Sequence, residues 1–157
     1  MRLQNNTKQF TSRHEALLKF LRRLITSSNV WLLKISQGRL GNSFLGVPVL
    51  LLTTTGRKSG RQRTQPLYYL ESKDRFVLVA SNAGTATDPA WLFNILANPI
   101  VSADVRGEIR AMKAHVASAN EKAMFWPQLT ALFPKWQMME DRSKRSFKVV
   151  ILDPLDR

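Results

Sequence analysis

The segment of the sequence with the richest chemistry is the basic stretch from Thr53 to Arg63. Four cationic side chains fall within seven of its residues: Arg57, Lys58, Arg61 and Arg63. Gly56 and Gly60 permit a tight backbone path, and Ser59 adds a hydroxyl donor. Such a loop can present N–H groups and fixed positive charges to one phosphate or to a cluster of carboxylates. On composition alone a solvated basic hairpin is slightly favoured over an anion site, and the GxxxxGK[ST] spacing of a P-loop is absent.

A second group of small and polar residues follows an apolar run at Ala80-Ser81-Asn82-Ala83-Gly84. Asp88-Pro89 then opens an apolar stretch, with Asp as the expected N-cap and Pro at the first helical position. Helix N-termini and small-residue turns are places where anions and planar cofactors approach the backbone closely. Trp91, just inside this helix, is by itself more typical of a core aromatic than of a cofactor contact.

Other reactive residue types are scarce in the chain. There is no cysteine, which excludes disulfides, zinc-thiolate sites and thiol nucleophiles and fits a reducing cytoplasm. The two histidines, His14 and His115, have no partner at metal-ligand spacing. We therefore expect both to be structural or surface residues, and we expect no metal site.

The positive charge is unevenly distributed along the chain. Of the net charge of +13, residues 1–70 contribute +11, from twelve Lys and Arg against one acidic residue, and residues 71–157 contribute +2. The basic half suits an anionic partner: nucleic acid, an anionic bilayer or a multiply charged small molecule. The expected strands lack an evenly spaced aromatic platform for bases, so no nucleic-acid partner is expected.

The N-terminal region, residues 1–35, is predicted to be a basic amphipathic helical segment. Within residues 13–25, apolar side chains recur with a period of 3.6 and cations occupy the other faces. The pattern favours a helix packed on the domain, and the alternative is a segment that lies on anionic lipid. No run approaches the roughly 20 apolar residues of a membrane-spanning helix.

From Val47 onward the pattern changes to strands and turns. The expected strands are residues 47–55, 66–70, 76–80, 100–105, 109–116 and 147–152. The expected helices run from Asp88-Pro89 to about Asn98, and from a capping box that begins at Ser118 to about Leu132. About six strands with short intervening helices favour an antiparallel barrel over a parallel sheet. We expect one domain over residues 1–157.

Four segments in this order resemble a known family: VLLLTTTGRKSGRQRTQPLYYL, VASNAGTATDPAWLFNILANP, FWPQLTALFP and VVILDP. They are similar to the deazaflavin (F420)-dependent nitroreductase and F420H2-dependent quinone reductase family, from about Trp31 to Pro154. The resemblance implies an α+β, mainly β fold, a flavin-reductase-like split β-barrel. It also implies that the protein binds coenzyme F420 and transfers a hydride to a small organic acceptor such as a quinone, an enone or a nitro-aromatic. The implied localisation is cytoplasmic, either free or bound peripherally to the inner face of the cell membrane.

The resemblance also implies a set of site residues. The phosphate-binding loop falls on Arg57, Lys58, Ser59 and Arg63. The adjoining coenzyme positions fall on Thr64, Gln65, Pro66, Leu67 and Tyr68. Contacts to the deazaflavin ring fall on Ala80, Ser81 and Asn82, and those at the helix start fall on Ala90, Trp91 and Asn94. We expect Ser81 and Tyr68 to be the catalytic residues, Ser81 as a hydrogen-bond donor and Tyr68 as the candidate proton donor. A buried tyrosine whose hydroxyl is hydrogen-bonded within the protein is an equally good interpretation of Tyr68.

The sequence departs from the family at two places. Where family members often carry tyrosines in a YPxYxxY pattern, this chain has Phe133, Trp136 and Met139, which predicts a more apolar substrate pocket. Asn82 stands where a lysine can follow the strand-end serine. Three alternatives remain: an FMN enzyme on the same barrel, an F420 carrier without turnover, and a basic nucleic-acid binder. The oligomeric state is left open.

Overall fold

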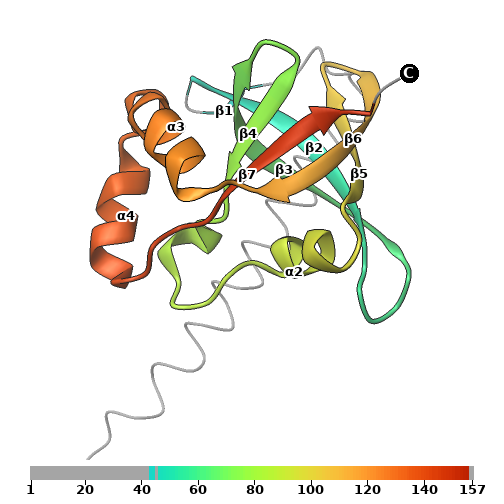
Figure 1. Cartoon of the computed structure of the whole chain (residues 1–157), viewed down its shortest axis with the longest axis horizontal. Helices are drawn as coiled ribbons and strands as arrows, with labels where there is room; N and C mark the ends of the chain where they lie inside the picture. The colour runs from blue at the N-terminus through green and yellow to red at the C-terminus, as the bar shows by residue number, and fades with distance from the viewer. Residues whose placement is uncertain (1–42, 45, 156–157) are drawn as a thin grey trace, which may run out of the picture.

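The computed structural model describes residues 43–44 and 46–155 of the chain. Within them, one antiparallel sheet runs in the order β1-β2-β3-β4-β7-β6-β5, and a further pairing of β2 with β5 closes it (Figure 1). The strands are β1 (Ser43–Phe44), β2 (Val47–Thr55), β3 (Gln62–Ser72), β4 (Arg75–Val79), β5 (Ile100–Val105), β6 (Glu108–Val116) and β7 (Val149–Pro154). The helices are η1, a 3₁₀ turn (Asn82–Gly84), α2 (Ala90–Ala97), α3 (Ala119–Leu132) and α4 (Lys135–Ser143).

Closure gives each of the strands β2 to β7 a hydrogen-bonded neighbour on both sides. The C-terminal strand β7 lies between β4 and β6 and completes the ring. Strands that are paired on both sides offer fewer free edges for pairing with another chain. The predicted mainly β split barrel with short flanking helices is therefore confirmed.

Alternation along the strands produces two cores, because successive side chains of a strand point to opposite faces. In β4, Phe76 and Leu78 fill the barrel interior, while Val77 and Val79 face outward. Outside, Phe125 of α3 packs in the same cluster as the outward valines, and α3 and α4 cover this face of the barrel (Figure 1). The protein therefore has one hydrophobic core inside the barrel and a second between the barrel and the helices α3 and α4.

The expected elements agree with the structure except at several ends. β2, β5 and α3 have the predicted bounds, and the capping box of Ser118 and Glu121 is present at the start of α3. β3 is longer than predicted and begins at Gln62, and β7 begins two residues later than predicted, at Val149. Helix α4 was not predicted.

The prediction that Asp88 caps α2 was wrong. Pro89 occupies the N-cap position, and no side chain caps that helix end. The Asp88 carboxylate instead pairs with Arg145 and Lys148, which approach from the segment between α4 and β7. Ion pairs with two cations occupy both carboxylate oxygens of Asp88, and they outcompete a hydrogen bond from one backbone N–H at the helix end.

The N-terminal helix predicted over residues 13–25, and the whole segment 1–35, lie outside the described residues. The prediction of a single domain over residues 1–157 stays a prediction for the same reason. No helix in the described part of the chain has both the length and the apolar character needed to cross a bilayer.

Candidate functional site

The basic loop between β2 and β3 is a tight turn that depends on Gly56. The Gly56 N–H donates to the carbonyl of Arg61 (2.8 Å), and the Gly60 N–H donates back to the carbonyl of Gly56 (2.7 Å). A Cβ at Gly56 would lie 2.9 Å from Ser59 Oγ and 3.1 Å from the Arg61 carbonyl oxygen. A larger residue there would displace the Ser59 side chain and crowd the Arg61 carbonyl, so glycine suits this turn.

All four cations of this loop are exposed: Arg57, Lys58, Arg61 and Arg63. Among the described residues, none of the four forms an ion pair with an acidic side chain. Arg57 lies over the ring of Phe93, with its guanidinium carbon 4.9 Å from the ring centroid. The loop therefore presents positive charge to solvent that no protein carboxylate neutralises.

Asn94 of α2 connects this loop to β2 and α2 through hydrogen bonds. Its Nδ2 donates to the hydroxyl of Thr54 (3.0 Å), and its Oδ1 accepts from the backbone N–H of Arg57 (3.1 Å). Asn94 is 8% exposed and Thr54 is 1% exposed. The side-chain amide of Asn94 thus joins the end of β2, Arg57 of the loop and α2. Sequence reasoning placed Asn94 among the coenzyme contacts but did not identify Thr54.

The next predicted positions, residues 64–68, follow the loop along β3 and are half-buried. The Thr64 and Thr53 hydroxyls lie 2.8 Å apart in a hydrogen bond across β2 and β3. Leu67 packs against the barrel interior, whereas Tyr68 faces outward toward α3 and α4. At the start of α2, Ala90 is exposed and Trp91 belongs to the barrel core.

The turn after β4 has an unusual backbone. Ala80 is fully buried, and the next residues, Asn82, Ala83 and Gly84, have φ values of 47°, 55° and 76°. The left-handed region is strained for residues other than glycine, at a cost of about 1 kcal/mol or more each. Such strain persists only where the surrounding structure imposes it, and it is common at functional sites.

The predicted substrate-pocket residues form a cluster with Tyr68. The Tyr68 ring lies 5.0 Å from Phe133 and 6.3 Å from Trp136, and these two rings lie 5.3 Å apart, centroid to centroid. Phe44 of β1 stacks on Tyr68 at 6.4 Å. Trp136 is only 3% exposed, so it forms the base of the cluster. Burial raises the pKa of the Tyr68 hydroxyl above its ordinary value, which keeps this group protonated.

Helix α4 joins this aromatic cluster to the strained turn. A Cβ at Gly84 would lie 3.2 Å from Cβ and Cγ of Met139, so α4 packs directly on η1. The structure therefore brings Met139 next to the turn, and Phe133 and Trp136 next to Tyr68. The sequence signal for α4 is a modest one: Trp136, Met139 and Ser143 recur at i, i+3 and i+7 on one face.

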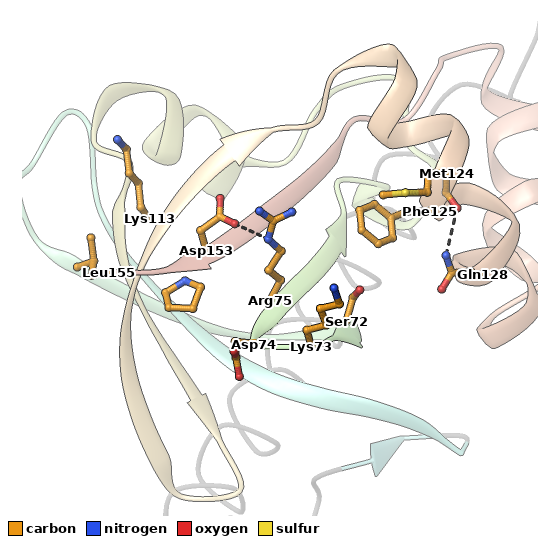
Figure 2. A pocket seen from close by; sticks show the side chains of 11 residues that line it. Ser72, Lys73, Asp74, Arg75, Lys113, Met124, Phe125, Gln128, Asp153 and Leu155 are labelled. Atoms are coloured by element: carbon orange, nitrogen blue, oxygen red, sulfur yellow. Dashed lines mark hydrogen bonds and ion pairs between the residues drawn. The ribbon is translucent and has the colours of Figure 1, made fainter. Parts of the chain in front are cut away.

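Two surface hollows lie at the other end of β3, away from the basic loop. The larger, of about 1040 Å³, is lined by Ser72, Lys73, Asp74, Arg75, Lys113, Met124, Phe125, Gln128, Asp153, Pro154 and Leu155 (Figure 2). Arg75 pairs there with Asp153 (2.8 Å), which also contacts His115 (3.0 Å). No predicted site residue lines either hollow. Within the described residues, no group of three or more His, Asp and Glu could hold a metal ion.

Comparison with known proteins places the chain in a family. A family model described as F420H(2)-dependent quinone reductase matches residues 26–154. A Mycobacterium tuberculosis protein, Rv3178, whose curated name provisionally gives it this activity, is 34% identical over 117 residues, 74% of this chain and 98% of that protein.

Two further relatives carry related names. The F420H(2)-dependent quinone reductase Rv1261c of M. tuberculosis is 41% identical over 71 residues, 45% of this chain and about half (48%) of that protein. The solved structure of an F420-H2 dependent reductase, FDR-A, is 31% identical with a TM-score of 0.63, and the match covers 68% of this chain and 94% of that one. The chain therefore belongs to the F420H(2)-dependent quinone reductase family.

Proposed function

We propose that this protein transfers a hydride from reduced coenzyme F420 to a quinone, with the coenzyme bound between the β2–β3 loop and the turn after β4. Family membership makes the chain an oxidoreductase that uses coenzyme F420. The placement of the coenzyme is our inference. The observation that supports it most is the group of four exposed cations without carboxylate partners among the described residues, on a loop that Asn94 fixes to α2.

The residues present fit the anionic part of the coenzyme, which is a phosphate with an oligoglutamate tail. In the proposal Arg57, Lys58 and Arg63 bind the phosphate and tail carboxylates, and Ser59 adds a polar contact. Guanidinium and ammonium groups form strong charge-assisted hydrogen bonds with such oxygens. The turn closed around Gly56 keeps these side chains on one short segment.

The ring of the coenzyme is proposed to contact residues of β3, of the turn after β4 and of the start of α2. Thr64, Gln65, Pro66, Leu67 and Tyr68 supply the β3 side, Ala80, Ser81 and Asn82 supply the turn, and Ala90, Trp91 and Asn94 support it from α2. The Ser81 side chain makes no capping hydrogen bond to η1, so its hydroxyl is proposed to donate to the ring or to a substrate oxygen. Reduced F420 would supply the hydride when bound, and the protein would bind and orient the coenzyme and exclude water from it.

The acceptor side is proposed to be the aromatic cluster of Tyr68, Phe133 and Trp136, with Met139 beside it. A planar, uncharged quinone suits such a surface, because aromatic rings offer stacking and apolar contact. Reduction to a hydroquinone takes up one hydride and one proton. The Tyr68 hydroxyl, which burial keeps protonated, is the proposed proton donor.

The decisive experiment is a fluorescence titration of the purified protein with oxidised F420, with FMN in parallel. Saturable binding of F420 supports the proposal. Binding of FMN alone would identify an FMN enzyme on the same barrel. Binding without oxidation of reduced F420 by any quinone, enone or nitro-aromatic would identify a carrier. Binding of neither coenzyme, together with salt-sensitive binding to DNA or RNA, would favour the nucleic-acid alternative.

Charge reversal tests the phosphate position directly. Arg63→Glu is expected to abolish F420 binding without changing the melting temperature, because the exposed side chain contributes charge and not packing. Lys113→Glu is the matched control, since Lys113 is an exposed strand cation beside the hollow at the opposite end. Normal binding by Arg63→Glu would refute this position for the phosphate.

Peripheral membrane binding is a further part of the proposal, and it rests on sequence alone. Residues 1–42 contain eight Lys and Arg and one acidic residue, and residues 13–25 have an amphipathic pattern. Co-sedimentation at low salt with phosphatidylglycerol vesicles, and not with phosphatidylcholine vesicles, is expected. The double variant Arg22→Glu, Arg23→Glu should stay in the supernatant, and wild-type protein that does not pellet would end this part of the proposal.

A further inference from the structure

Arg145 lies in the segment between α4 and β7, and its guanidinium contacts the turn that follows β4. Its Nη2 donates to the carbonyl of Ser81 (2.9 Å), its Nη1 to that of Ala80 (3.3 Å) and its Nε to that of Thr85 (3.2 Å). Nη1 also pairs with the Asp88 carboxylate. One side chain, 16% exposed, thus binds three backbone carbonyls and one carboxylate of a single segment.

The position of Arg145 is itself well defined. Its guanidinium carbon lies 4.6 Å from the ring centroid of Phe147, which is 1% exposed. Lys144, the C-cap of α4, has a left-handed φ of 51° and turns the chain toward the barrel. Asp88, 13% exposed, also pairs with Lys148 (2.8 Å), so the carboxylate opposite Arg145 is held by a second cation.

The turn that Arg145 binds is the strained one. Its carbonyls at Ala80 and Ser81 point to the guanidinium, whereas the N–H groups of Ser81, Asn82 and Ala83 have no partner among the described residues. Ser81 is right-handed helical and Asn82 is left-handed. That succession turns neighbouring N–H groups toward one side and creates a concave site for an electron-rich atom.

We infer that Arg145 is a positioning residue, which fixes the strained turn so that its backbone N–H groups donate to the oxygen and nitrogen acceptors of the coenzyme ring. This inference rests on the proposed function and adds a residue and a donor set to it. A guanidinium is required because its planar fork offers five donors, enough to bind carbonyls on both sides of the turn, whereas an ammonium acts as a point charge. Preorganised donors of this kind stabilise charge that shifts within a bound ring.

Arg145→Lys tests the inference, because it keeps the charge but loses the fork. Arg142→Lys is the matched control, since Arg142 is exposed in the last turn of α4. Three quantities are measured for each protein: the Kd for F420, the visible absorption band of F420 at saturation, and the melting temperature without coenzyme. The band reports hydrogen bonding to the ring, which a purely structural brace elsewhere would not change.

Wild type and Arg142→Lys are expected to bind F420 with the same Kd. Both should shift the visible absorption band of bound F420 by the same amount from its position in free F420. Arg145→Lys should raise the Kd about tenfold, and its band should return toward that of free F420. If Arg145→Lys does not melt cooperatively, Asp88→Asn replaces it, since this change leaves the guanidinium without its carboxylate partner. Asp88→Asn should shift Kd and band in the same direction, but less.

The outcomes separate this inference from the proposed function. Failure of wild type to bind F420 overturns the proposed function itself. Wild type that binds F420 without any band displacement, or an Arg145→Lys protein with the wild-type Kd and band, overturns only the role of Arg145. An Arg145→Lys protein that is merely less stable, with an unchanged band, would make Arg145 a structural brace.

Discussion

At the scale of single residues, two side chains determine the backbone path of the two proposed coenzyme-binding segments. Asn94 accepts a hydrogen bond from the Arg57 N–H of the basic loop, and Arg145 donates to the carbonyls of the turn after β4. Neither needs to contact the coenzyme to affect its binding. Their removal displaces the groups that do make contact, and small displacements of such groups have large effects on affinity and rate.

Asn94→Ala should destabilise the protein and weaken F420 binding together. The change leaves the buried Thr54 hydroxyl without its partner, at a cost of about 1–3 kcal/mol, and frees the Arg57 N–H. Chemical denaturation and an F420 titration measure the two effects. Asn98→Ala is the control, because Asn98 accepts only the exposed N–H of Ile100. An unchanged Kd for Asn94→Ala would show that the loop keeps its shape without this amide.

Tyr68→Phe should lower the kcat of quinone reduction by about a hundredfold while the Kd for F420 stays unchanged, since proton donation contributes on that order. Because burial raises the pKa of Tyr68, the wild-type hydroxyl stays protonated and its contribution to kcat should be constant from about pH 6 to 9. Tyr69→Phe is the control, as Tyr69 is 2% exposed and packs inside the barrel. Equal kcat values for both variants would remove Tyr68 from the mechanism.

At the scale of elements, α4 has an importance that its length does not suggest. It places Trp136 beneath Tyr68 and Met139 on Gly84, and its C-terminus leads into Arg145. One short helix therefore supports the proposed acceptor surface and the proposed ring-binding turn. A shift of α4 would alter both at once, so coenzyme binding and acceptor choice should be coupled.

Gly84→Ala tests the packing of α4 on η1. Gly84 and Gly60 both have positive φ, and alanine at either position should cost about 1–2 kcal/mol of backbone strain. A Cβ at Gly84 also meets Met139 at 3.2 Å, whereas a Cβ at Gly60 meets nothing within 4 Å. Denaturant unfolding should therefore show a larger loss for Gly84→Ala than for Gly60→Ala. Equal losses in the free energy of unfolding would mean that α4 moves away from a Cβ at Gly84 without a loss of stability.

At the scale of the whole molecule, the charge pattern fits a ligand with several negative charges. Residues 1–70 carry +11 of the net +13, and the four loop cations belong to this half. Fixed charges of one sign attract a multiply charged ligand over distances that salt shortens.

Salt should accordingly weaken F420 binding. Raising the ionic strength from about 0.05 to 0.5 M should increase the Kd for F420 about tenfold or more, because the loop contacts are exposed. The KM for an uncharged quinone, measured at saturating F420, is the internal control and should stay nearly constant. A Kd that does not respond to salt would argue against ionic binding of the tail.

The sequence predicted the barrel well because its signals are local. An apolar, β-branched run identified β2, and the capping box at Ser118 identified α3. It failed where a distant partner decides the local structure. Asp88 reads as a helix cap until Arg145, 57 residues later, pairs with its carboxylate.

The candidate site shows the same division. The basic loop was evident from composition, and the aromatic residues of the acceptor surface came from the family resemblance. Left-handed φ values at Asn82 and Ala83 could not be predicted, because only tertiary bonds make that strain tolerable. Arg145 was missed because it stands in a run of basic residues with nothing in the sequence to distinguish it.

The place of β7 in the barrel has a consequence for biosynthesis. β7 is the last strand among the residues that the structure describes, yet it lies between β4 and β6. Until the ribosome has released residues 149–154, a nascent chain exposes two unpaired strand edges and cannot close the ring. The ring can therefore close only once β7 has emerged from the ribosome, and a chain cut short before Val149 should be a substrate for chaperones and proteases.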